Sequence, residues 1–255
     1  MRVVVAPDKF KRSLEAAQVA DAIDRGLRRA RPDLQTTIVP MADGGEGTVA
    51  ATIAAGAQAV ERIVRGPLGS PARAVFALDG PTAVVEMARA SGLTLLAPAD
   101  RDARRASSYG TGELLRAALD AGVTRIVVGI GGSASNDGGA GMLAALGVRL
   151  LDARGVDVPL GGAALRGLAR IDVTGLDPRL RDVDLTIAAD VDNPLCGPTG
   201  ASAVFGPQKG ATRDQVRELD AALAHFADLS AAVLGRDLRD TPGSGAAGGL
   251  GFALL

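Results

Sequence analysis

Lysine and asparagine are scarce in this chain, and their positions are informative. The lysines are Lys9, Lys11 and Lys209 and the asparagines are Asn136 and Asn193, whereas arginine is common throughout. All five lie in segments punctuated by glycine or proline, which favours a functional reason over chance clustering. An ammonium group is a compact charge that suits a single phosphate oxygen, whereas a guanidinium is a planar fork. The pattern therefore indicates phosphate chemistry.

The first of these segments is PDKFKRS at 7–13. It offers two cations, Lys9 and Lys11, together with the carboxylate of Asp8 and the hydroxyl of Ser13. We predict catalytic roles for the lysines and binding roles for Asp8 and Ser13. Ser13 could equally be the N-cap of the helix that follows.

A second loop, ADGGEGT at 42–48, is also rich in glycine. Gly44 and Gly45 leave backbone N–H groups free to approach an anion. Asp43 and Glu46 are suited to hold Mg²⁺ or to act as a base, because carboxylate oxygens are hard ligands. The alternative is a tight turn with solvated carboxylates.

The strongest local signal is GGSASNDGGAG at 131–141, with five glycines between a predicted strand and a predicted helix. Such backbone freedom is typical of a nest of N–H groups around a phosphate. We predict that the following residues of this loop bind substrate or nucleotide: Gly132, Ser133, Ser135, Asn136, Asp137 and Gly138.

The fourth loop, ADVDNPLCGPTG at 189–200, places Asp190 and Asp192 at a strand end with Asn193 beside them. Two carboxylates at this spacing could share a metal ion or divide the roles of base and ligand. We predict binding by Asn193 and by Lys209 in the nearby segment FGPQKGA. Cys196 has no histidine close in sequence to activate it, so we interpret it as a packed side chain.

Each of the four loops follows a predicted strand, and short β-branched runs alternate with helical periods, which predicts an α/β fold. A soft boundary near residue 60 precedes a more antiparallel region. In open α/β sheets, ligands collect at the carboxyl ends of strands. The expected strands are 2–6, 36–40, 59–65, 72–78, 82–87, 125–130 and 184–189, and the expected helices are 14–30, one starting near 48, one over 140–146, and 212–233, on which His225 faces solvent.

Composition excludes several classes of protein. A formal net charge of -1 provides no overall field for nucleic acid or an anionic membrane, and aromatic residues make up only 2%. No apolar run reaches transmembrane length, and no signal peptide is recognisable. A single cysteine agrees with a reducing cytoplasm. The oligomeric state stays open, a homo-oligomer included.

Two nucleotide-binding motifs receive little support. GSGAAG at 243–248 fits G-x-G-x-x-G, but no β-branched strand precedes it and no acidic residue follows at the required distance. The P-loop pattern G-x-x-x-x-G-K-[ST] does not occur. Another glycine motif, YGTGELL at 109–115, reads as a short turn that opens a helix.

Taken together, the motifs resemble the type I glycerate kinases. The matching segments run in the family's order over essentially the whole chain and are APDKFKRSL, MADGGEGT, RGPLGSP, VEMARASGL, SSYGTGEL, GIGGSASNDGGAGML, AADVDNPLCGPTGASAVFGPQKGA and PGSGAAGGLG. The resemblance implies a cytoplasmic enzyme that phosphorylates D-glycerate with ATP and Mg²⁺, with 2-phosphoglycerate favoured over 3-phosphoglycerate as product.

The same resemblance implies a Rossmann-like parallel-sheet domain, only partly present, with an inserted mixed α/β second domain. We assign residues 1–60 to the N-terminal part of the Rossmann-like domain. Residues 61–255 are assigned to the inserted α/β domain and to the start of the segment in which the chain returns to the first domain. Family members continue beyond the last residue of this sequence. The expected consequence is weak kinase activity for the 255-residue chain, or a noncatalytic remnant that binds glycerate or nucleotide without turnover.

Phosphoryl transfer depends mainly on positioning and neutralisation of charge. Our hypothesis is that the Gly-rich loop, with Ser133, Ser135 and Asn136, holds the ATP phosphates, while Lys9 and Lys11 neutralise the transferring phosphoryl group or the glycerate carboxylate. Asp190 or Asp192 accepts the hydroxyl proton. The remaining carboxylates among Asp43, Glu46 and Asp192 hold Mg²⁺. The competing arrangement places ATP at the first two loops and glycerate at the Gly-rich loop.

Overall fold

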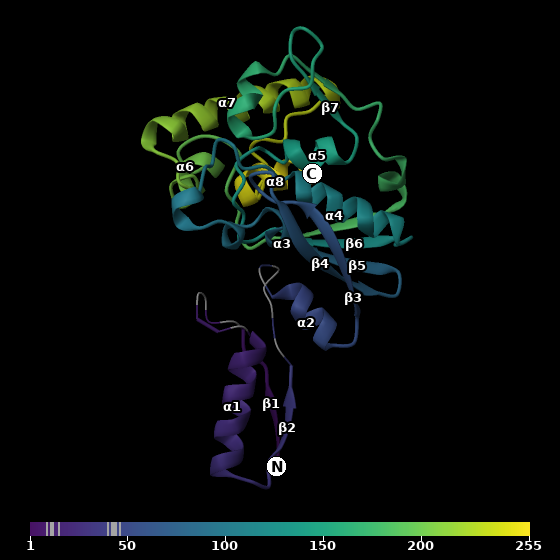
Figure 1. The fold of residues 1–255 in the computed structure, drawn as a ribbon, viewed down its shortest axis with the longest axis vertical. Coiled ribbons are helices and arrows are strands. Elements are labelled where there is room, and N and C mark those ends of the chain that lie inside the picture. Colours follow the sequence, from purple (N-terminus) through teal and green to yellow (C-terminus); the bar gives the residue numbers. More distant parts are fainter. Residues whose placement is uncertain (9, 11–12, 15, 40, 42–44, 46) are drawn as a thin grey trace.

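The structure, a computed structural model, describes residues 1–8, 10, 13–14, 16–39, 41, 45 and 47–255. Helices and strands alternate through most of this part of the chain, and a mixed sheet lies at the centre of the larger body (Figure 1). The predicted α/β class is confirmed. The lysines Lys9 and Lys11 and the predicted metal ligands Asp43 and Glu46 lie outside the described residues, as does Gly44.

The N-terminal segment forms a small parallel unit from β1 (Arg2–Val5), α1 (Ala16–Ala30) and β2 (Gln35–Ile38). The two strands pair in parallel, with Val5 opposite Ile38. Val5 and Val19 are buried where the helix covers the strands, whereas Val4 is 66% exposed because alternate strand residues face opposite sides. Figure 1 shows this unit at the end of the molecule away from the central sheet.

The central sheet has five strands in the order β3-β4-β5-β6-β9. The pairs β3-β4 and β4-β5 are antiparallel, as the sequence predicted after the boundary, and the pairs β5-β6 and β6-β9 are parallel. One sheet thus joins an antiparallel half to a parallel half. Its strands are β3 (Gln58–Arg65), β4 (Pro71–Asp79), β5 (Thr82–Glu86), β6 (Arg125–Gly129) and β9 (Asp184–Ala188).

The parallel half brings three strand ends to one edge. Glu86 pairs with Gly129, and Gly129 pairs with Ala188, so the last residues of β5, β6 and β9 are in register. The loops that leave these strands therefore start side by side. This edge is where the third and fourth predicted loops begin.

Helix α2 (Thr48–Ala54) packs on the central sheet, where buried Val49 contacts a small cluster with Ala77 and Val84. The short helix α3 (Ala88–Ser91) follows β5 directly. The division of the chain at residue 60 stays a prediction.

The YGTGELL motif, which we predicted to be a short turn that opens a helix, lies inside helix α4 (Tyr109–Asp120). The helix begins at Tyr109, so Gly110 and Gly112 lie within its first turns and not in a preceding turn. A Cβ on Gly110 would be 2.1 Å from the Arg65 carbonyl oxygen, and one on Gly112 would be 2.4 Å from that of Met142. The glycines let α4 approach β3 and α5 (Ala140–Ala145) closely.

Helix α7 (Arg213–Leu234), predicted over 212–233, buries Leu219, Leu223 and Phe226, and the last two of these belong to a second core. Thr212 and Gln215 form a capping box at its start. His225 is not a free surface residue, because it is half-buried and its Nε2 lies 2.7 Å from the Leu168 carbonyl oxygen. The remaining α-helices and strands of the described residues are β7 (Arg149–Leu151), β8 (Arg170–Asp172), α6 (Ala201–Phe205) and α8 (Ala246–Leu254), and short 3-10 helices occur in several of the connections.

Among the helices of the described ranges, none combines the length and the apolar character that crossing a membrane requires.

Candidate functional site

The second and third predicted loops meet at the edge of the central sheet. A Cβ built on Gly131 would lie 2.9 Å from the Cα atom of Gly45, closer than ordinary contacts allow. Gly45 belongs to the ADGGEGT loop and Gly131 opens the Gly-rich loop. The missing side chain of Gly131 is therefore what permits this approach.

Buried Glu86 fixes the end of the ADGGEGT loop onto the sheet. Its Oε1 accepts a hydrogen bond of 2.6 Å from the Val49 amide at the start of α2, and its Oε2 pairs with Arg89 at 3.1 Å. The side chain is only 1% exposed. Sequence reasoning missed Glu86, although an acidic residue that ends an apolar strand is a usable signal.

The loop after β5 also forms part of the site. The Leu93 amide donates to the Gly132 carbonyl oxygen at 2.9 Å, and the Ala134 amide donates to the Ser91 carbonyl oxygen at 2.8 Å. The segment from Ser91 to Leu93 thus lies along the Gly-rich loop. Its residues occur in the VEMARASGL motif, but no individual role had been predicted for them.

Asp137 lies inside the Gly-rich loop and not on its surface. Its carboxylate accepts bonds from the Ser108 amide at 2.8 Å and the Ser108 hydroxyl at 2.9 Å, and from the amides of Gly139 and Gly141 at 3.2 Å. Burial raises the pKa of this carboxyl, while the hydrogen bonds oppose the shift. The geometry makes Asp137 an anchor for the loop backbone.

Lys209 is a buried cation beneath the same loop. Its Nζ donates to the Ser133 hydroxyl at 2.7 Å and to the Ser135 carbonyl oxygen at 2.6 Å. The side chain is 1% exposed, and burial lowers the pKa of the ammonium to about 7, against the opposing charge of Asp137. The structure thus joins Lys209 to two predicted loop residues.

Two buried polar atoms of the loop have no partner among the described residues: the Ser135 hydroxyl oxygen and Asn136 Oδ1. The other end of the Asn136 amide donates to the Ser202 hydroxyl at 2.8 Å. Leaving a buried polar atom unpaired costs about 1–3 kcal/mol. These atoms therefore favour a water molecule or a ligand group beside them.

The C-terminal glycines close over this network. The Gly138 amide donates to the Gly248 carbonyl oxygen at 2.9 Å, and a Cβ on Gly248 would lie 2.1 Å from the Ser135 carbonyl oxygen. Gly248 has a φ of 71°, in the left-handed region that glycine adopts readily. The GSGAAG segment thus packs against the Gly-rich loop and does not follow a strand.

The fourth loop begins beside the third. The Ile130 amide donates to the Ala188 carbonyl oxygen at 3.2 Å, so Asp190 and Asp192 follow a strand end that adjoins the Gly-rich loop. Both carboxylates are exposed. The Asn193 side chain donates to the Thr199 carbonyl oxygen at 2.7 Å, which stabilises the loop internally.

At the N-terminal unit, the first and second loops also start together, because the Met41 amide donates to the Pro7 carbonyl oxygen at 2.9 Å. Ser13 is exposed and its amide donates to the Phe10 carbonyl oxygen at 2.8 Å. Because α1 begins at Ala16, Ser13 is not at the N-cap position. Asp8 lies in the described part of this loop.

Neither a metal cluster nor an activated thiol is found in the described part of the chain. No three His, Cys, Asp or Glu side chains gather there as ligands would. Cys196 is half-buried, and burial raises the pKa of its thiol to about 12, which agrees with a packing role.

The model of the Glycerate kinase family matches residues 3–255. The chain belongs to this family. It is 55% identical to the glycerate kinase of Bacillus subtilis and 52% identical to the glycerate 2-kinase of Escherichia coli, in both cases over 100% of this chain and 68% of the relative's length. The crystal structure of a Salmonella typhimurium LT2 protein provisionally named glycerate kinase 2 matches with a TM-score of 0.90 and 53% identity, and the match covers 100% of this chain and 69% of that one.

The arrangement of the loops agrees with what phosphoryl transfer requires in a member of the glycerate kinase family. Backbone amides of a Gly-rich loop, a buried cation and exposed carboxylates all occur around one sheet edge, and phosphoryl transfer depends on positioning and neutralisation of charge. Ser108 and Ser202, which orient Asp137 and Asn136, were missed by sequence reasoning because they lie 29 and 66 residues from their partners.

Proposed function

We propose that this chain transfers the γ-phosphoryl group of ATP to D-glycerate, with 2-phosphoglycerate as the product. The observation that supports the proposal is the contact between Gly45 and Gly131, which places two glycine loops with predicted phosphate roles against one another. Family membership and the name of the glycerate 2-kinase relative support the substrate and the position of phosphorylation.

In this proposal the Gly-rich loop binds the triphosphate at its accessible start, through the amides of Gly131 and Gly132, with Ser133, Ser135 and Asn136 beside it. The amides of Ala134, Gly138, Gly139 and Gly141 already donate within the protein and hold the shape of the loop. The unpartnered Ser135 hydroxyl supports this role, because it can donate to a phosphate oxygen, whereas Asn136 Oδ1 is an acceptor and needs a water molecule or a hydroxyl donor beside it. Lys209 supports the loop from beneath. Lys9 and Lys11 neutralise the transferring phosphoryl group or the glycerate carboxylate.

The acceptor side is proposed to lie at the fourth loop. The hydroxyl oxygen at C2 of glycerate attacks the γ-phosphorus, the bond from phosphorus to the bridging oxygen breaks, and ADP leaves. The hydroxyl proton passes to Asp190 or Asp192, whose exposed carboxylates can meet a substrate from solvent.

Mg²⁺ would be held by the carboxylates among Asp43, Glu46 and Asp192 and would neutralise charge on the triphosphate. Of these, Asp192 is described and exposed, which leaves its oxygens available to an ion. Asn193 and Asp8 are proposed to complete the binding surface. The cytoplasmic location stays a prediction.

A coupled assay of ADP release tests the proposal. ADP should appear only when ATP, Mg²⁺ and D-glycerate are all present, and L-glycerate serves as the matched control. ATP binding without D-glycerate-dependent ADP release would instead support a binding protein without turnover.

A further inference from the structure

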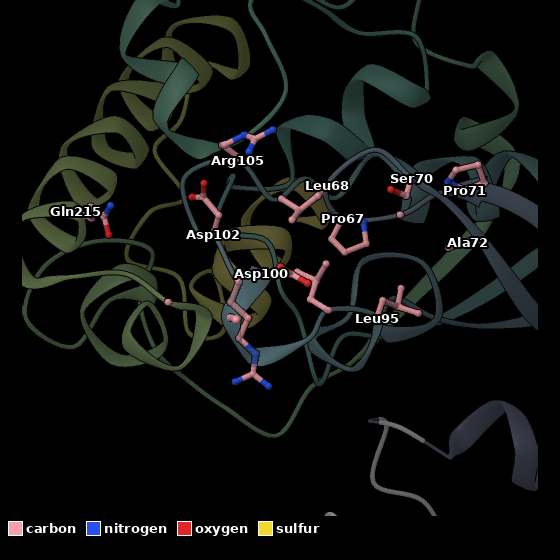
Figure 2. A pocket seen from close by; sticks show the side chains of 15 residues that line it. Pro67, Leu68, Ser70, Pro71, Ala72, Leu95, Asp100, Asp102, Arg105 and Gln215 are labelled. Carbon is pink, nitrogen blue, oxygen red and sulfur yellow. The ribbon is translucent and has the colours of Figure 1, made fainter.

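A cavity beside the segment from Leu95 to Arg105 has a lining whose charges cancel. It lies between that segment and the turn that joins β3 to β4, and its volume is about 750 Å³ (Figure 2). Its two acidic lining residues, Asp100 and Asp102, are matched by two basic ones, Arg101 and Arg105. The charges of this cavity therefore favour neither an anion nor a cation.

A second cavity has a lining that does select a class of ligand. It has a volume of about 440 Å³, which is within the range of small-molecule sites, and it lies between the start of α4, helix α5 and the loop from Asp157 to Leu165. Small residues of α5 leave space on one side. The buried side chains of Val148, Leu150 and Leu165 line it with hydrocarbon, so the cavity suits a ligand with an apolar body.

The lining of this second cavity carries one positive charge in excess. Its charged residues are Arg65, Arg149 and Asp157, two basic and one acidic. Arg149 is neutralised by Asp157, because its Nη2 atom lies 2.9 Å from Oδ2 of Asp157. The nearby carboxylate of Glu113 accepts a hydrogen bond of 2.6 Å from the main-chain amide of Arg65. No carboxylate in the described part of the chain forms an ion pair with the Arg65 guanidinium, which is therefore available to an anion.

The ring of Tyr109 holds the Arg65 guanidinium at the cavity. The Cζ atom of Arg65 lies over the ring at 4.6 Å from its centroid, which is a cation–π contact. Stacking covers one face of the guanidinium and leaves its edges, which carry the N–H donors, for a carboxylate. Because one positive charge is in excess, a monoanion is favoured over a dianion such as a phosphate monoester.

We propose that this second cavity binds a monocarboxylate with an apolar body. Its carboxylate pairs with Arg65, and its hydrocarbon part packs against Val148, Leu150 and Leu165. The ligand is not D-glycerate, because every carbon of D-glycerate carries oxygen and offers little apolar surface to these walls. The site is additional to the proposed kinase reaction, and none of the loop residues proposed to meet ATP lines the cavity.

Tyr109 allows binding to be observed at the cavity itself. It is the only tyrosine of the chain, which has no tryptophan, so tyrosine fluorescence reports from the cavity wall. The probe is cyclohexanecarboxylate, which is transparent where tyrosine absorbs. Cyclohexanecarboxamide has the same shape without the charge, and D-glycerate has the charge without the apolar body. Calorimetry on the purified protein gives the dissociation constants independently.

Two substitutions test the two halves of the site. Arg65→Met removes the cation at an exposed position, and Arg62→Met is its control, because Arg62 is exposed on the same strand and does not line the cavity. Ala144→Phe fills the cavity from α5. Ala231→Phe is its control, because Ala231 is also a half-buried helical residue and lies outside the lining.

The wild-type protein should bind cyclohexanecarboxylate with a dissociation constant of about 1 mM or tighter, and the fluorescence of Tyr109 should change on binding. Cyclohexanecarboxamide should bind at least about tenfold more weakly, and D-glycerate should not displace the probe. Arg65→Met and Ala144→Phe should each weaken binding of the probe at least about tenfold, whereas the two controls should match the wild type. If Ala144→Phe does not fold, Arg65→Met still tests the proposal.

Three results would each overturn the proposal. They are a folded wild-type protein that does not bind cyclohexanecarboxylate, equal affinity for the carboxylate and the carboxamide, and wild-type affinity in Arg65→Met. Displacement of the probe by D-glycerate would also overturn it, because the cavity would then belong to the acid substrate. The binding measurements need no turnover, so their outcome is independent of whether the chain phosphorylates D-glycerate.

Discussion

Lys209 Nζ donates a hydrogen bond of 2.6 Å to the carbonyl oxygen of Ser135, 74 residues away in sequence. This contact joins the segment before α7 to the turn that we propose to hold phosphate. Because the ammonium is 1% exposed, the loop backbone and the Ser133 hydroxyl replace the water that a lysine normally binds. The shape of the Gly-rich loop thus depends on a cation that lies outside the loop.

The buried ammonium should make stability depend on pH. Burial lowers the pKa of Lys209 from 10.5 to about 7, so between these values the unfolded chain binds a proton that the folded protein does not. The contribution of Lys209 therefore makes the free energy of unfolding rise with pH in this window. Below about pH 7, Lys209 contributes no pH dependence.

Lys209→Met removes that pH dependence. Urea unfolding from about pH 6 to about pH 9 should show the wild-type protein gaining stability relative to the variant by up to about 1.4 kcal/mol per pH unit above pH 7. Arg213→Met, which removes an exposed charge close by in sequence, is the control and should follow the wild-type pH dependence. Parallel curves for wild type and Lys209→Met would rule out the lowered pKa.

Lys9→Arg and Lys11→Arg are each expected to lower kcat by at least about tenfold, which corresponds to 1.4 kcal/mol in the barrier. A guanidinium cannot reproduce the compact contact of an ammonium with a single phosphate oxygen. Steady-state kinetics measure the effect, and Arg29→Lys, an exposed position at the end of α1, is the reverse exchange that should have no effect. Normal kcat in both lysine variants would remove the argument from lysine scarcity.

The variants Asp190→Asn and Asp192→Asn test whether either carboxylate acts as the catalytic base or only supports the loop. If one of these carboxylates takes the hydroxyl proton, its variant should lose kcat and retain affinity for D-glycerate, because a base acts only as the transition state forms. Asp184→Asn is the control, since Asp184 is an exposed carboxylate at the opposite end of β9. Near-normal kcat in both variants would direct the search for the base to the ADGGEGT loop.

Gly131→Ala tests the contact between the two glycine loops. The added methyl group would lie 2.9 Å from the Cα atom of Gly45, so the loops must move apart and kcat should fall by at least about tenfold, as small displacements of reacting groups can cause. A Cβ on Gly167 meets nothing within 4 Å, so Gly167→Ala should retain activity. Equal activity in the two variants would show that the contact is unimportant.

Much of the fold follows from local sequence patterns. The β-branched runs predicted the strands at 2–6, 125–130 and 184–189 because alternation and burial of apolar residues are local properties. The helical period over 212–233 similarly predicted α7. The same patterns missed the two-stranded pair β7-β8, whose strands have three residues each and show too few positions for a period.

The site was predicted less completely, because its key contacts depend on tertiary structure. The loops could be predicted from their glycines, because positive φ values and close backbone contacts favour glycine over other residues. No sequence pattern shows that Asp137 points inward to Ser108, or that Lys209 is buried, because both depend on partners distant in the chain. Gly110 and Gly112 were read as a turn for the same reason: their purpose is contact with β3 and α5.

The most direct measurement of the central claim is a phosphorus NMR spectrum of the reaction products. When the protein is incubated with ATP, Mg²⁺ and D-glycerate, we predict that the γ-phosphoryl signal is replaced by the signals of ADP and of a phosphomonoester whose phosphorus couples to the proton on C2. A sample in which ATP binds but no phosphoglycerate forms, or in which only inorganic phosphate appears, would contradict the proposed function.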